Sequence, residues 1–228
     1  MIVAVTGLGR EARIVSRPNV ATVIGGGDGA RLRTQIKAAF DNGARRVLSI
    51  GICGALSPAL AVGDCIVATE IVAQEQRYIA YQPWTDELLA RVPEARPGAI
   101  AGSEKIVAQA DEKTRLYRAT GAAGVDMESH IAAAMAQEFG LPFAALRVVS
   151  DSSRASLPHA AEVAMSPNGK VDFLAVLRSL MARPGQIPAL LQTAWDAEKA
   201  FGVLFRCRHV LAPGLAPANL GELSLDVG

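Results

Sequence analysis

The sequence has few aromatic residues, few cysteines and almost no net charge, and each scarcity excludes a class of protein. Aromatic residues make up 5% of the 228 positions, and the formal net charge is +1 at pH 7. A chain this neutral lacks the basic surface on which nonspecific nucleic-acid binding depends. Its three cysteines are widely spaced, which excludes a disulfide framework or a zinc ribbon. We therefore expect a cytoplasmic protein with reduced thiols, no nucleic-acid partner and no metal.

Long apolar runs are also missing. No stretch of about 18 apolar residues is available to cross a membrane. The apolar residues 1–9 lack a basic start, so we expect them to form a first strand rather than a signal peptide. Half of the chain is hydrophobic, which is enough for one sizeable core. We predict one domain over residues 1–228, with a helical C-terminal extension from about residue 184.

Apolar runs of strand length alternate with stretches of helical periodicity in the first 150 residues. This alternation predicts an α/β fold with a mostly parallel sheet and helices on both faces. In such sheets ligands bind at the carboxyl ends of the strands. We expect strands at residues 2–5, 21–24, 46–50, 65–72, 123–127 and 143–150, and helices at 30–42, 84–92, 112–119 and 129–139, with breaks at Pro184 and Pro188.

A glycine motif follows the first expected strand. Residues 7–12 read Gly-Leu-Gly-Arg-Glu-Ala, which matches the fingerprint that places a pyrophosphate at a helix N-terminus. Asp28 follows about 20 residues later, where an acidic residue would bind a ribose. However, Asp28 lies within a run of glycines rather than at the end of a strand. A nucleotide-binding module therefore stays open as one interpretation.

Polar or small residues also follow three other expected strands. Gly51 and Gly54 would let a ligand approach backbone N–H groups closely, although a plain tight turn explains them too. Glu128 at a helix start can accept two hydrogen bonds, as from a sugar diol, whereas Asp126 fits better as a carboxylate that stabilises the helix start. Asp151 follows a buried strand and can act there as a general acid or simply cap a turn.

These residues occur in an order that resembles a known family. Gly-Leu-x-x-Glu, Gly-x-Cys-Gly-Ala-Leu, Val-x-Met-Glu-Ser and Val-Ser-Asp follow one another within roughly residues 1–180. The chain is similar in this to the superfamily of nucleoside phosphorylases and methylthioadenosine/S-adenosylhomocysteine nucleosidases. The resemblance implies a three-layer α/β fold whose central mixed, partly barrel-like sheet is flanked by helices. It also implies cleavage of the N-ribosidic bond of a nucleoside.

The resemblance assigns a role to each motif. Asp151 would protonate purine N7 with support from Ser150, and Glu128 would bind the ribose hydroxyls above Met127. Glu11 would activate water, as it does in the hydrolytic members. Such a set suits an oxocarbenium-like transition state, which needs an acid, a hydroxyl clamp and a nucleophile. The base would lie near Ile106 and Val107, and the phosphate or water site would comprise Gly51, Ile52, Cys53, Gly54, Arg10 and Arg13.

The nucleophile stays open at this stage. Phosphorolytic members carry Ser or Thr where this chain has Ile52, whose side chain donates no hydrogen bond. Arg10 and Arg13 could instead hold phosphate, while Glu11 favours water. We expect no cofactor beyond inorganic phosphate as a possible co-substrate.

The C-terminal extension carries apolar residues at near-helical spacing, among them Leu191, Trp195 and Phe205. They suit packing onto the core or a sister subunit, and also contact with a lipid-linked substrate or a membrane surface. This tail and the Gly-Leu-x-x-Glu-Ala motif most resemble hopanoid-associated phosphorylases, which implies phosphorolysis of adenosylhopane by a homo-oligomer. A hydrolytic methylthioadenosine/S-adenosylhomocysteine nucleosidase is the alternative.

Overall fold

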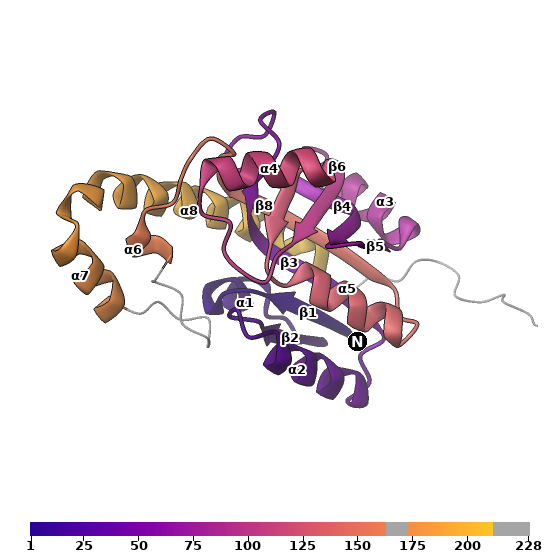
Figure 1. Cartoon of the computed structure of the whole chain (residues 1–228). Helices are drawn as coiled ribbons and strands as arrows, with labels where there is room; N and C mark the ends of the chain where they lie inside the picture. The colour runs from indigo at the N-terminus through magenta and orange to yellow at the C-terminus, as the bar shows by residue number, and fades with distance from the viewer. Residues whose placement is uncertain (163–172, 212–228) are drawn as a thin grey trace, which may run out of the picture.

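A mixed sheet of eight strands forms the centre of the protein (Figure 1). The computed structural model describes residues 1–162 and 173–211. The strands alternate with helices along the chain, as the sequence pattern predicts. They are β1 (Ile2–Thr6), β2 (Val20–Ile24), β3 (Arg46–Ala55), β4 (Cys65–Ala73), β5 (Gln76–Ile79), β6 (Arg96–Gly102), β7 (Gly124–Asp126) and β8 (Phe143–Asp151).

Five strands close into a ring, which makes the sheet partly barrel-like. Strand β3 pairs with β7, β7 with β6, β6 with β4, β4 with β8, and β8 returns to β3. Strands β1 and β2 extend the sheet from β3, and β5 extends it from β4. The β3–β7, β4–β8 and β4–β5 pairs are antiparallel and the other pairs are parallel. The expected mixed, partly barrel-like architecture is confirmed.

Helices cover both faces of this sheet. One core cluster contains buried residues of α2 and α5, such as Ile36 and Ala132, and a second contains residues of α1, α3 and α8, such as Val15, Trp84 and Leu204. The three layers expected from the resemblance are therefore present. The helices are α1 (Gly9–Val15), α2 (Gly29–Asp41), α3 (Gln82–Arg91), α4 (Ala110–Thr120), α5 (Ser129–Glu138), α6 (His159–Glu162), α7 (Phe173–Ala182) and α8 (Ile187–Cys207), with short 3-10 turns at Pro184–Gln186 and Arg208–Leu211.

Three local expectations need correction. Residues 51–54 continue strand β3 rather than forming a turn. The glycines at 51 and 54 let neighbouring side chains approach the strand closely. Strand β5 was not expected, since its four residues are mostly exposed and lack an apolar pattern. Pro188 lies in the first turn of α8 and does not break the helix, because a proline there removes no hydrogen bond.

The C-terminal extension divides into two parts. The second half of α8 buries Phe201 and Leu204 in the core. By contrast, α7 and the first half of α8 project from the body (Figure 1), and Trp195 is 74% exposed. The single-domain prediction also spans residues 163–172 and 212–228, which lie outside the described residues. No helix in the described part of the chain combines the length and apolar character that a membrane span requires.

Candidate active site

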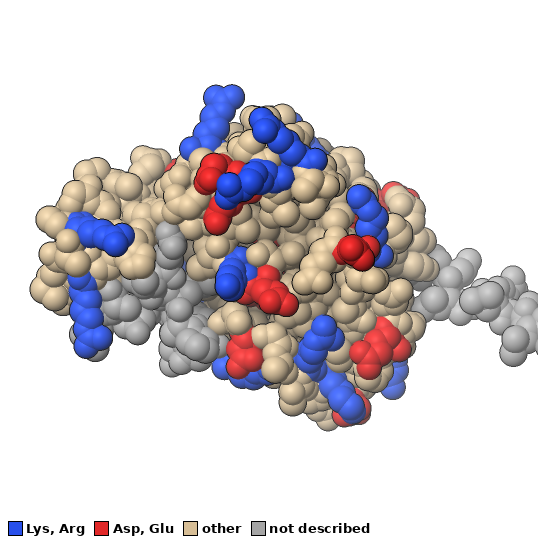
Figure 2. All heavy atoms as spheres, viewed as in Figure 1, with Lys and Arg blue, Asp and Glu red and all other residues tan. Residues whose placement is uncertain are grey.

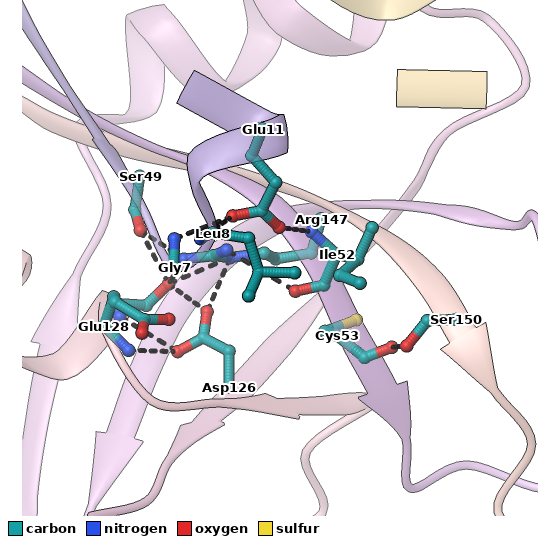
Figure 3. Close-up of polar contacts among 11 residues, drawn as sticks. Gly7, Leu8, Glu11, Ser49, Ile52, Cys53, Asp126, Glu128, Arg147 and Ser150 are labelled. Carbon is teal, nitrogen blue, oxygen red and sulfur yellow. Dashed lines mark hydrogen bonds and ion pairs between the residues drawn. The ribbon is translucent and has the colours of Figure 1, made fainter. Parts of the chain in front are cut away.

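Four buried charged side chains gather where β1, β3, β7 and β8 meet. Glu11 comes from α1, Asp126 ends β7, Glu128 precedes α5, and Arg147 lies in β8. Figure 3 shows the Arg147 guanidinium between the carboxylates of Glu11 and Asp126. Charged side chains are rarely buried unless they are paired, and three carboxyl groups here surround one cation. Such a cluster marks a candidate functional site.

The carboxylate of Glu11 is fixed by three backbone N–H groups. One oxygen accepts hydrogen bonds from Gly7 and Leu8, and the other accepts one from Ile52, each at 2.7 Å. Burial raises the pKa of Glu11, and Arg147 together with the three amides opposes that rise. The carboxylate thus lies directly beside residues 51–54 of β3. A carboxylate with a raised pKa is better suited to take a proton from water.

Arg147 is the cation that the carboxyl groups of the cluster surround. It was not identified as a site residue from the sequence. Its guanidinium forms an ion pair with Asp126 at 2.5 Å and donates to Ser49 Oγ at 2.5 Å and Ser129 Oγ at 3.1 Å. The side chain is completely buried. The sequence did contain a signal, which is a single charged residue within an otherwise apolar strand. A buried charge in a central strand requires polar or oppositely charged partners, so its presence indicates a polar cluster.

Asp126 and Glu128 have different roles, as their positions suggested. One oxygen of Asp126 accepts the N–H groups of Glu128 at 3.2 Å and Ser129 at 2.9 Å, so Asp126 stabilises the start of α5. Burial raises the pKa of Glu128 to about 8, with contributions from Asp126 and Glu11 and opposition from Arg147. Burial therefore favours the protonated form of the Glu128 carboxyl.

The Glu128 side chain lies against two glycines, one directly after β1 and one directly after β2. A Cβ atom at Gly25 would lie 2.5 Å from Glu128 Cγ, and one at Gly7 would lie 3.0 Å from a carboxyl oxygen. Met127 is the neighbour of Gly27, where a Cβ would lie 3.4 Å from the Met127 methyl group. The loops after β1 and β2 therefore leave the space that this carboxyl occupies.

Glu128→Gln is expected to flatten the pH dependence of stability. The folded-state pKa of about 8 exceeds the unfolded value of roughly 4.3. Between these values the folded protein holds a proton that the unfolded chain has released, so the wild-type free energy of unfolding falls as pH rises. Urea unfolding at pH 5, 6.5 and 8 measures this fall. Parallel curves for wild type and variant would contradict the assignment, and Glu138→Gln, at an exposed site on α5, is the control.

Asp151 lies at the other end of the same stretch of β3. A Cβ atom at Gly54 would lie 3.2 Å from Asp151 Oδ2. Ser150 Oγ lies 2.8 Å from Asp151 Oδ1 and 3.0 Å from the Cys53 carbonyl oxygen. The buried ammonium of Lys113, on α4, forms an ion pair with Oδ2. Residues 51–54 thus separate Glu11 from Asp151 by about 10 Å of extended strand.

Gly51 is required by the close approach of two buried side chains. A Cβ atom there would lie 2.4 Å from Glu11 Oε1 and 2.6 Å from Arg147 Nη1. We expect Gly51→Ala to displace both groups, to destabilise the protein by about 1–3 kcal/mol and to lower activity further than stability alone explains. Thermal unfolding and activity of the folded protein measure the two effects. Gly202→Ala on α8 is the control, because a Cβ there meets nothing within 4 Å.

Other predicted site residues lie apart from this cluster or at its margin. Arg10 pairs with Glu198 on α8 and lies over the ring of Phe201, and Arg13 donates to the carbonyl of Gly9 on its own helix. Both arginines are exposed and have these partners, and their expected role in holding phosphate beside residues 51–54 stays a prediction. Ile106 and Val107 lie in the loop between β6 and α4, and both are partly buried.

The glycine fingerprint has a different use from the one its pattern suggests. Glu11 takes the amides of Gly7 and Leu8 that a pyrophosphate would need. Asp28 accepts a hydrogen bond from the N–H of Arg31 and caps α2. Both observations disfavour a dinucleotide site. Across residues 1–162 and 173–211, no group of three histidine, cysteine or acidic side chains has the arrangement to hold a metal ion.

Comparison with known proteins finds a matching family model and solved structures with the same fold. A family model described as the phosphorylase superfamily matches residues 2–182. Aminodeoxyfutalosine nucleosidase of Helicobacter pylori (strain J99) is 26% identical over 136 residues, which span 49% of this chain and 57% of that relative. Two solved structures share the fold. Futalosine hydrolase of Helicobacter pylori strain 26695 has a TM-score of 0.65 at 17% identity, over 92% of this chain and 96% of the other. S-adenosylhomocysteine nucleosidase of Streptococcus pyogenes has a TM-score of 0.68 at 14% identity, over 95% and 97%.

Proposed function

Because the chain belongs to the phosphorylase superfamily and is an enzyme that acts on N-glycosidic bonds, we propose that it hydrolyses the N-ribosidic bond of a 5′-substituted adenine nucleoside. The observation that carries this proposal is the position of the Glu11 carboxylate. It lies on the amides of Gly7, Leu8 and Ile52, at the opposite end of residues 51–54 from Asp151. An acid and a base held on either side of one site suit glycosidic cleavage.

The reaction would proceed through a ribosyl cation with oxocarbenium character. Asp151 gives its proton to N7 of adenine as the bond between N9 and C1′ breaks. Glu128, which is ionised when the nucleoside is bound, accepts hydrogen bonds from the ribose hydroxyls, which become stronger donors as positive charge develops. Glu11 takes a proton from water as the water oxygen bonds to C1′. The products are adenine and a ribose with a free hydroxyl at C1′.

The surroundings of Glu11 favour water over phosphate as the nucleophile. The N–H of Ile52 donates to Glu11, and the Ile52 side chain has no hydrogen-bond donor. A phosphate beside Glu11 would meet a carboxylate, and like charges at close range repel. Arg10 and Arg13 have partners elsewhere. The proposal therefore departs from the phosphorolysis that the resemblance to hopanoid-associated phosphorylases implies, and takes up the hydrolytic alternative.

A second candidate substrate carries a long apolar 5′ group, as adenosylhopane does. The observation in its favour is the exposed apolar surface of α7 and α8, formed by Leu177, Met181, Ile187, Leu191 and Trp195. Figure 2 shows this end of the molecule, at the left, largely covered by uncharged side chains. A membrane surface or a second copy of the chain would cover the same residues.

Adenine release tests both choices. The substrates are methylthioadenosine and an adenosine with a long apolar 5′ chain, each with and without phosphate. We expect release without phosphate, and in ¹⁸O-labelled water the label should appear at C1 of the ribose product. A strict phosphate requirement would overturn hydrolysis. Preference for the apolar substrate would favour the second candidate, and preference for methylthioadenosine would contradict it.

A further inference from the structure

The ammonium group of Lys113 is completely buried beneath the loop that follows β8. It donates to Asp151 Oδ2, to the Ser152 carbonyl at 2.9 Å and to the Ala155 carbonyl at 2.8 Å. An ammonium has three donors and no acceptor, so each of its hydrogens has one partner. Rotation of the group would break at least one of these bonds in a buried site. Lys113 therefore holds Asp151 from one fixed direction.

This contact decides which oxygen of Asp151 can carry a proton. Oδ2 faces a group that only donates, so a proton on Oδ2 would point toward another donor. The proton of the acid form must lie on Oδ1. That oxygen lies 2.8 Å from Ser150 Oγ, which also lies 3.0 Å from the Cys53 carbonyl oxygen.

Ser150 suits both charge states of Oδ1, because a hydroxyl donates one hydrogen and accepts as well. With Asp151 ionised, Ser150 donates to Oδ1. With Oδ1 protonated, Asp151 donates to Ser150 Oγ or to the substrate, and Ser150 donates to Cys53. Only Oδ1 changes partner between the two states, while Lys113 stays on Oδ2.

We propose that Lys113 is a positioning residue that confines the catalytic proton of Asp151 to Oδ1 and aims that oxygen at the leaving base. The proposal rests on the proposed function, in which Asp151 is the acid. In this arrangement the positive charge of Lys113 lies on the side of Asp151 that faces away from the base. This charge stabilises the carboxylate that remains once the proton has moved to N7.

Lys113 is not the only link between α4 and this loop. The N–H of Ala110 donates to Ser156 Oγ at 3.1 Å, and the N–H of Leu157 donates to the Ala108 carbonyl at 2.9 Å. The loop therefore keeps two anchors when Lys113 is replaced. We expect Lys113→Gln to fold, with a lower unfolding temperature than wild type. The effect on chemistry can then be measured separately from the effect on folding.

Two leaving groups distinguish a positioning role from a merely structural one. Lys113→Gln is expected to lower kcat for adenine release by about 10- to 100-fold. The same variant should retain hydrolysis of 4-nitrophenyl riboside, because nitrophenolate is a stable anion that leaves without a proton. Lys37→Gln, at an exposed site paired with Asp41, should change neither rate. Equal losses on both substrates in folded protein, or no loss of adenine release, would overturn the proposal.

A double-mutant cycle with Asp151→Asn gives an independent test. Because Lys113 acts through Asp151, adding Lys113→Gln to Asp151→Asn should cost no further adenine release. Losses that multiply would show that Lys113 acts elsewhere and would overturn the proposal. Failure of wild-type protein to release adenine from any nucleoside would instead overturn the proposed function.

Discussion

Asp151→Asn is expected to lower adenine release by about 100- to 10,000-fold, which is the range that a well-placed general acid contributes. Asparagine keeps the size and shape of the side chain, and its oxygen can still accept from Lys113. However, an amide has no proton to give to N7, so adenine would leave as an unstabilised anion. The KM for the nucleoside should change less than kcat, since the proton moves only as the bond breaks.

The measurement must separate chemistry from folding, because Lys113 loses its counter-charge in this variant. A buried ammonium without a carboxylate destabilises a protein, so the rate is referred to the folded fraction. Asp111→Asn is the matched control. Asp111 lies on the same helix as Lys113 and pairs with Arg115 at an exposed site. A folded Asp151→Asn protein that releases adenine at the wild-type rate would remove Asp151 from the mechanism.

The sequence located the residues of the candidate site better than it predicted their contacts. Glu11 and Glu128 follow strands, Asp151 is the last residue of one, and the structure brings all three around β3. Strand ends could be predicted because short apolar runs are punctuated by glycine, asparagine or proline. The depth at which each side chain is buried could not be predicted, because it depends on which strands become neighbours.

Arg147 and Lys113 were not identified as site residues from the sequence, for two different reasons. Arg147 was visible as one charge within β8, and the need for buried charges to be paired should have marked it. Lys113 gave no such signal. Its helix also carries Asp111, Glu112 and Arg115, so the pattern reads as a solvated face. Only the loop that folds over Lys113 buries it, and that contact joins positions about 40 residues apart.

The closed ring of strands likewise could not be predicted from the spacing of apolar residues along the chain. Alternating strands and helices predicted a mostly parallel sheet, whereas β8 pairs in parallel with β3 and antiparallel with β4. That second pairing closes the ring. The mixed, partly barrel-like sheet was expected only from the resemblance to a known superfamily, because pairing between distant strands leaves no local pattern in either strand.

Glu11→Gln is expected to reduce hydrolysis by about 100- to 10,000-fold, since the amide cannot take a proton from water. The change also disturbs the site. Both carboxylate oxygens accept backbone N–H groups, so the amide nitrogen of glutamine would face a donor. We therefore expect a lower unfolding temperature as well. Glu87→Gln, at the i,i+4 pair with Arg91 on α3, controls for loss of a carboxylate.

Added phosphate makes this variant decisive for the nucleophile. If water attacks C1′, Glu11→Gln should stay slow at every phosphate concentration, because the missing base is not replaced. If phosphate attacks, the negative charge of Glu11 opposes it, and its removal should preserve or raise the rate with phosphate present. That second outcome would contradict hydrolysis and restore phosphorolysis as the reaction. Phosphate dependence in this one variant therefore separates a carboxylate that activates water from one that merely fills the space beside Gly51.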